Sequence, residues 1–146
     1  MNALEIVKTA LDNAEKGIIR ESDYTEDMTF SGPVPKPLKR EEYVSVMKNM
    51  IAGIPDWNYH ARDFSSDGDT VRATVEISGT QTRTLQPVIP GMSALPPTNK
   101  KFKLPKEYLT VKVRGDKICE FHADVPANGG VSGILTQLGV PVKKAA

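Results

Sequence analysis

The spacing of apolar residues changes at Trp57, and this change limits the fold more than any other feature of the chain. Before it, apolar side chains recur at helical spacing from residue 4, and again from residue 39 to Pro55. After it, apolar and polar residues alternate, which is typical of strands with one buried face. A short helix is expected over residues 131–138. Helices, then a strand meander, then a closing helix predict an α+β fold with a curved, mostly antiparallel sheet wrapped around the N-terminal helices.

Two hairpins are expected after the change, with tight turns at Asp67-Gly68 and Gly115-Asp116. Five prolines in residues 85–105 predict a long loop or irregular strand pieces between the hairpins. A sheet curved around helices leaves a cone-shaped interior, so we expect a barrel with a central pocket for a small apolar ligand. The hairpin strands are expected at residues 57–64, 71–81, 106–114 and 117–125.

Composition indicates one ordinary soluble domain over residues 1–146, with 39% apolar and 25% charged residues. A net charge of +1 gives no reason to expect nucleic acid or an anionic membrane surface as a partner. No apolar run approaches the roughly 20 residues of a membrane helix, and the N-terminus lacks a basic-then-apolar export signal. The single cysteine, Cys119, excludes an intramolecular disulfide. We therefore expect a cytoplasmic protein.

The strand over residues 117–125 carries the candidate chemistry. Glu120, His122 and Asp124 alternate, so their side chains share one face. If that face lines the pocket, His122 and Asp124 form a proton-transfer pair, and an apolar setting would make the carboxylate a better base. If instead Phe121 and Ala123 face the core, the three polar side chains point to solvent or to a dimer partner. The pattern alone leaves both alternatives open.

Other residues predict a binding site without metal chemistry. Trp57 and Tyr59 share a face and could stack on a planar ligand, or serve as core or interface aromatics. Met92 lies in the proline-rich loop, where it could cover the mouth of the pocket. The two histidines and one cysteine lack close ligand spacing, so we expect no metal site.

Three short motifs resemble those of the SnoaL-like polyketide cyclase family, within the nuclear-transport-factor-two-like superfamily. Residues 77–81 (ISGTQ) are similar to a strand that ends in Gly-Thr-His, and residues 96–100 (PPTNK) to a Pro-Pro-Thr-Gly-Arg loop. Residues 115–120 (GDKICE), followed by Gln-Leu-Gly at residues 137–139, are similar to Asp-Gly-Lys-Ile-x-Glu and a terminal Gln-Leu-Gly. The order and rough spacing of the motifs hold from about residue 4 to residue 139.

The resemblance implies a homodimer of conical barrels, each with an apolar pocket and no metal or organic cofactor. In the cyclases of this family, an aspartate late in the chain takes a proton from carbon and drives an aldol closure through an enolate. Relatives with the same fold include isomerases, dehydratases and hydrolases, so the fold does not fix the function. This sequence departs from the family at Gln81, where histidine is usual, and at His122, where tryptophan is usual. The position of the family's aspartate falls near Pro126, and Asp124 is the nearest carboxylate.

We therefore predict a cyclase-like or isomerase-like enzyme that acts on a small apolar, oxygenated molecule. Asp124 would transfer protons with help from His122, Glu120 would orient or shield, and Gln81 would donate a hydrogen bond to a substrate oxygen. The alternative is a non-catalytic ligand-binding or dimerising accessory domain of the same fold. Such a domain would keep its ligand after removal of both Asp124 and His122.

Overall fold

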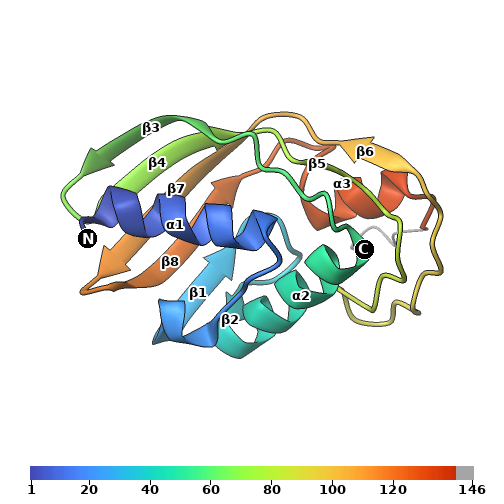
Figure 1. The fold of residues 1–146 in the computed structure, drawn as a ribbon, viewed down its shortest axis with the longest axis horizontal. Helices are drawn as coiled ribbons and strands as arrows, with labels where there is room; N and C mark the ends of the chain where they lie inside the picture. Colours follow the sequence, from blue (N-terminus) through green and yellow to red (C-terminus); the bar gives the residue numbers. More distant parts are fainter. Residues whose placement is uncertain (141–146) are drawn as a thin grey trace.

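The computed structural model describes residues 1–140, in which helices pack against the inner face of a curved sheet (Figure 1). The first helix contacts four strands of the sheet, and the second contacts the strands at its other end. Within residues 1–140, no helix is long and apolar enough to cross a membrane. The helices are α1 (Ala3–Glu15), α2 (Arg40–Gly53) and α3 (Gly130–Gln137), with a short 3-10 turn, η1 (Glu21–Asp23), after α1.

The main sheet has six strands in the order β2-β1-β8-β7-β4-β3, and a small second sheet pairs β5 with β6. All neighbouring pairs are antiparallel except β1 and β8, which run parallel. The expected α+β class and the mostly antiparallel sheet are confirmed, although the sheet curls without closing and ends at β2 and β3. The strands are β1 (Tyr24–Ser31), β2 (Leu38–Lys39), β3 (Arg62–Asp67), β4 (Thr70–Val75), β5 (Ser78–Thr80), β6 (Lys101–Lys103), β7 (Glu107–Arg114) and β8 (Lys117–Asp124).

The two hairpin turns lie where expected, but the first strand of the first hairpin begins later in the chain than predicted. The expected strand over residues 57–64 begins only at Arg62, because His60 has a positive φ angle of 46°, which interrupts an extended strand. Asp63, with a φ angle of 56°, lies within the strand, where the pairing with β4 shifts register. Asn58 forms only an isolated bridge with Ser78. The expected strand over residues 71–81 is likewise divided into β4 and β5.

A bulge in β8 determines which of its side chains face the core. Lys112 of β7 pairs with Glu120, whereas the next residue of β7 pairs with Ile118, so Cys119 is an extra residue in β8. Ile118 and Phe121 are therefore both buried although they are three residues apart. Beyond the bulge the alternation is regular, and the polar side chains of β8 point away from the helices.

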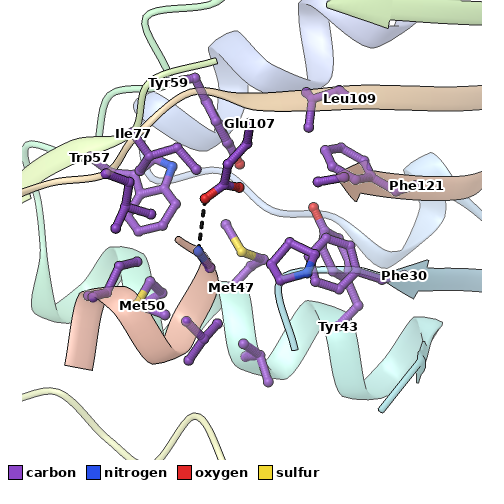
Figure 2. A pocket seen from close by; sticks show the side chains of 17 residues that line it. Phe30, Tyr43, Met47, Met50, Trp57, Tyr59, Ile77, Glu107, Leu109 and Phe121 are labelled. Carbon is purple, nitrogen blue, oxygen red and sulfur yellow. Dashed lines mark hydrogen bonds between the residues drawn. The ribbon is translucent and has the colours of Figure 1, made fainter. Parts of the chain in front are cut away.

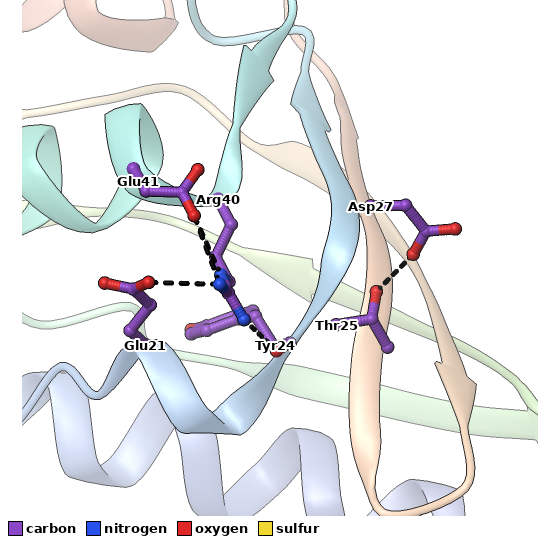
Figure 3. Close-up of polar contacts among 6 residues, drawn as sticks. All are labelled: Glu21, Tyr24, Thr25, Asp27, Arg40 and Glu41. Carbon is purple, nitrogen blue, oxygen red and sulfur yellow. Dashed lines mark hydrogen bonds and ion pairs between the residues drawn. The ribbon is translucent and has the colours of Figure 1, made fainter.

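An arginine at the start of α2 fixes this helix to the sheet (Figure 3). The Arg40 guanidinium forms ion pairs of 3.1 Å with both Glu21 and Glu41, and it donates a hydrogen bond to the carbonyl oxygen of Tyr24. On β1 itself, the Thr25 hydroxyl donates to Asp27 at 2.7 Å. The contacts of Arg40 hold α2 beside β1, and so place the buried side chains of Tyr43, Met47 and Met50 against the inner face of the sheet.

Candidate functional site

The inner face of the sheet, α2 and α3 enclose an apolar cavity (Figure 2). The volume open to the centres of water molecules is about 40 Å³, room for roughly three waters at about 10–15 Å³ each. A larger ligand would need the walls to move, and the flexible methionines of α2 suit such movement. The side chains around it include Phe30, Tyr43, Met47, Met50, Trp57, Tyr59 and Phe121.

Glu107 carries the only carboxyl group among the lining residues that the structure describes. It is 1% exposed and opens β7, at the end of the strand nearest α3. In Figure 2 the carboxylate points into the space between Trp57, Tyr59 and Met47. One of its oxygens accepts a hydrogen bond of 2.9 Å from the backbone N–H of Gly130, which is the first residue of α3. Among the described lining residues, the cavity thus contains one carboxyl group, held in a defined position.

Two opposing effects act on the Glu107 carboxyl. Burial in apolar surroundings disfavours the charged form and raises its pKa above the ordinary value of 4.5, whereas the hydrogen bond from Gly130 offsets part of that rise. The N-terminal end of α3 also carries partial positive charge, which favours the ionised carboxylate. A carboxylate with a raised pKa is a better general base near neutral pH than an exposed one.

Close backbone packing brings α3 to this carboxylate. The Val131 N–H donates to the carbonyl oxygen of Pro33 at 2.8 Å. A Cβ atom at Gly129 would lie 3.0 Å from a Glu107 oxygen and 2.8 Å from the Val125 side chain. A larger residue at position 129 would therefore require the Val125 and Glu107 side chains to shift.

Tyrosines on the cavity wall remain neutral hydrogen-bond donors. Burial raises the pKa of Tyr43 and of Tyr59 well above their usual value. The Tyr43 hydroxyl lies 3.5 Å from that of Tyr24, and burial raises the pKa of Tyr24 to about 12. The Tyr43 and Tyr59 hydroxyls, which line the cavity, could donate hydrogen bonds to an oxygenated ligand at any physiological pH.

Of the seven predicted site residues, Trp57 and Tyr59 line the cavity. Their rings meet edge to face, with centroids 5.8 Å apart. The backbone N–H of Tyr59 donates to Glu15 of α1 at 2.8 Å, which holds this segment in place although it lies outside regular strands.

His122, Asp124 and Glu120 lie on the outer face of the sheet, away from the cavity. The His122 ring sits between two oxygens, with Nδ1 2.8 Å from Ser31 Oγ and Nε2 3.0 Å from an Asp124 carboxylate oxygen. Their side chains are 39% and 75% exposed. Glu120 forms an ion pair of 3.3 Å with Lys112. The bulge at Cys119 and the burial of the opposite face account for this orientation, and a catalytic role for these residues stays a prediction.

Gln81 is completely buried, but it anchors a loop and does not line the cavity. Its amide nitrogen lies 2.9–3.1 Å from the carbonyl oxygens of Arg83, Leu95 and Pro96. Its amide oxygen accepts hydrogen bonds from the backbone N–H and the hydroxyl of Thr98. One side chain therefore joins both ends of the loop over residues 81–98.

We expect Gln81→Glu to lower the free energy of unfolding by about 3 kcal/mol, because a carboxylate has no hydrogen to donate to the surrounding carbonyl oxygens. Gln86→Glu makes the same chemical change at an exposed position of the same loop and should alter stability by less than about 0.5 kcal/mol. Urea unfolding of the two variants measures the difference. Equal losses in both would show that the buried hydrogen bonds of Gln81 contribute nothing specific.

Met92 lies in a second hollow, formed by the proline-rich loop, Pro35 and the residues after α3. This hollow is separate from the cavity around Glu107 and contains no charged lining residue within the described part of the chain. In residues 1–140, no group of three His, Cys, Asp or Glu side chains is arranged to hold a metal ion.

The sequence reasoning missed Glu107, although the sequence contains a signal for it. Glu107 is in phase with the buried alternate residues of β7, Leu109, Val111 and Val113. A carboxylate at an otherwise apolar alternate position predicts an inward-facing acid, which is a candidate functional group.

Comparison with known proteins defines the family. Residues 21–121, more than half of the chain, match the SnoaL-like domain family. The chain belongs to the SnoaL-like domain family. This confirms the resemblance inferred from the three sequence motifs. None of the curated proteins matches the sequence.

Solved structures of SnoaL-like and related proteins share the fold at low sequence identity. A candidate SnoaL-like polyketide cyclase from Jannaschia sp. CCS1 is 12% identical, with a TM-score of 0.70 over 96% of this chain and 93% of that one. IdmH from Streptomyces antibioticus, a candidate polyketide cyclase, is 22% identical, with a TM-score of 0.66 over 96% and 100%. An LEH-like epoxide hydrolase from M. tuberculosis is 10% identical, with a TM-score of 0.65 over 94% and 92%. Sequence identities this low establish only the fold. Two other solved structures with this fold are named ketosteroid isomerase-like and NTF2-like.

Proposed function

We propose that this SnoaL-like protein is a small-molecule enzyme of the cyclase or isomerase type, and that Glu107 is its general base. The observation that carries the proposal is a lone carboxylate with a raised pKa, fixed by one backbone hydrogen bond inside an apolar cavity. Solved structures with the same fold include proteins named polyketide cyclases and an epoxide hydrolase, which favours a small-molecule reaction without choosing among them.

The proposed step moves one proton and needs no redox partner. The ionised Glu107 takes a proton from a carbon next to the substrate's oxygenated carbon, and the electron pair of that C–H bond becomes the double bond of an enolate. In an isomerase, the protonated Glu107 returns the proton at a different carbon. In a cyclase, the enolate carbon attacks a second carbonyl carbon, and Glu107 gives its proton to the new alkoxide.

Proton exchange at carbon tests the proposal directly. Cyclopentanone is a suitable probe because it is small and apolar and has acidic α-hydrogens. In D₂O, the native protein should replace these hydrogens by deuterium faster than buffer and faster than the heat-unfolded protein, as followed by loss of the proton NMR signal. Exchange no faster than in those two controls would overturn the proposal.

Asp124→Asn distinguishes the cavity from the outer face as the site of proton transfer. If Glu107 is the base, this variant should keep its exchange rate within about twofold, because Asp124 lies on the other side of the sheet and is mostly exposed. A loss of exchange in Asp124→Asn, with the fold intact, would instead assign proton transfer to the His122–Asp124 pair.

The second candidate is the non-catalytic ligand-binding or dimerising domain. The departures from the family's pattern favour it, since Gln81 replaces the usual histidine and the nearest late carboxylate, Asp124, is mostly exposed. It predicts saturable binding of cyclopentanone with no deuterium exchange. A homodimer and a cytoplasmic location are compatible with both candidates and remain part of the proposal.

A further inference from the structure

We propose that the Trp57 indole N–H is the group that binds the substrate's oxygen, so that the cavity selects carbonyl compounds over hydrocarbons of the same shape. The inference names the substrate class of the site described above, and it rests on the proposed function for its place in a reaction. It assigns Trp57 a polar role, in addition to the stacking expected from its sequence pattern.

The indole nitrogen is a buried donor without an acceptor. Trp57 is 5% exposed, and within residues 1–140 its Nε1 is the one buried side-chain nitrogen or oxygen that makes no hydrogen bond. A buried N–H without a partner costs free energy, and most such groups in proteins are paired. Trp57 also lines the cavity, so this open donor belongs to a residue that a bound ligand would contact.

The open donor lies next to the proposed base. Trp57 and Glu107 both line the cavity, and Figure 2 shows the indole nitrogen on the side of the ring toward Tyr59 and Glu107. The indole lies near the Tyr59 hydroxyl and lowers its pKa against the rise caused by burial, but the two groups do not reach hydrogen-bond geometry. An oxygen acceptor inside the cavity can therefore take the indole N–H without displacing an existing bond.

This arrangement suits an enolate better than the starting ketone. When Glu107 removes an α-proton, the electron pair of the C–H bond forms the enolate double bond and the π pair of the carbonyl group moves to its oxygen, which becomes negative. A fixed N–H donor in an apolar cavity stabilises that negative oxygen more than the neutral carbonyl, because little water is present to screen the interaction. The donor and the base together would bind a carbonyl compound with an adjacent C–H bond.

The chain has a single tryptophan, so one indole signal in a proton–nitrogen NMR spectrum reports on this donor. Titration with cyclopentanone should move the Trp57 indole proton downfield in a saturable manner. Methylenecyclopentane, in which a =CH₂ group replaces the carbonyl oxygen, has the same shape without an acceptor and should cause no such shift. A ketone that leaves the indole proton in place, or a hydrocarbon that moves it equally, would overturn the assignment.

Trp57→Phe keeps an aromatic ring and removes the donor. We expect it to reduce the preference for cyclopentanone over methylenecyclopentane by about three- to tenfold, with both affinities read from the backbone amide of Gly130. An unchanged preference would refute the role of the indole. If this variant fails to fold, the titration of the native protein still decides the question.

Failure of this inference can be told apart from failure of the proposed function. If the ketone binds at Trp57 but no deuterium exchange occurs, the role of Trp57 as a donor holds and the proposed enzymatic function fails. If the native protein and Trp57→Phe exchange α-protons at the same rate, Glu107 remains the proposed base and Trp57 is not the donor.

Discussion

Glu107→Gln is expected to slow α-proton exchange by about 10²- to 10⁴-fold, the usual loss when a general base is removed. Glutamine has nearly the same size, and its amide oxygen can still accept the hydrogen bond from the Gly130 N–H. The start of α3 should therefore stay in place while the proton acceptor is lost. The measurement is the rate of deuterium uptake by cyclopentanone in the two proteins at equal concentration.

The pH dependence separates this base from the carboxylates on the surface. Burial raises the pKa of Glu107, so exchange by the native protein should increase with pH through a value above 4.5 and then level off. Any residual exchange in Glu107→Gln should lack that step. Glu120→Gln, which removes an exposed carboxylate paired with Lys112, is the matched control and should reproduce the native profile.

Glu107→Gln should also be more stable than the native protein at neutral pH. Between 4.5 and its raised pKa, the folded Glu107 holds a proton that the unfolded chain has lost, so folding stability falls as the pH rises through this window. Glutamine does not titrate, and the stability advantage of Glu107→Gln should therefore grow from pH 4.5 upward and then stay constant. Thermal unfolding across this range measures it; a native protein that gains stability relative to the variant as the pH rises would contradict a buried, destabilised carboxylate.

Local patterns predicted the elements of this fold well, because each depends on residues close together in the sequence. The apolar stripe that includes Tyr43, Met47 and Met50 required a helix, and α2 lies there. The turn at Gly115 has a φ of 64°, which glycine adopts readily, and the second hairpin is centred on it. The order of these elements also predicted the α+β class and the mostly antiparallel sheet, and the family motifs supported the same arrangement.

The site was harder to predict, because it depends on which neighbours each residue meets. The bulge at Cys119 arises from pairing between β7 and β8, and no property of the β8 sequence marks it. Gln81 was expected to touch a ligand, but its hydrogen bonds lie with loop residues 14 to 17 positions away, as well as with Arg83. Glu107 was detectable from its phase in β7, yet the burial that gives it a raised pKa comes from α2, α3 and Trp57.

Gly32→Ala is expected to cause the largest loss of stability, about 3–5 kcal/mol, or to prevent folding. Gly32 follows β1 with a φ of 107°, which side chains of L-residues rarely adopt. A Cβ atom there would fall on the carbonyl oxygen of Ala123 in β8, far inside the 3.0 Å that real Cβ atoms keep. Because the obstacle is backbone within the sheet, it cannot turn aside as a flexible side chain would.

Gly91→Ala is the matched control for the backbone angle. Gly91 has a φ of 79°, but a Cβ atom there would meet nothing within 4 Å. It should cost only about 1 kcal/mol, the usual cost of a left-handed alanine. Chemical unfolding of both variants isolates the steric part, and a loss in Gly32→Ala no larger than in Gly91→Ala would contradict the predicted clash.

The effect of Gly32→Ala should extend to the cavity. Pro33, the next residue, lines the cavity, and its carbonyl oxygen accepts the N–H of Val131 in α3. If the end of β1 moves away from Ala123, the start of α3 loses this anchor, and with it the fixed position of the Gly130 N–H on Glu107. Any folded fraction of Gly32→Ala should therefore exchange α-protons more slowly than folded Gly91→Ala, whose glycine lies in the separate loop. Equal rates per folded molecule would show that Glu107 holds its position without help from β1.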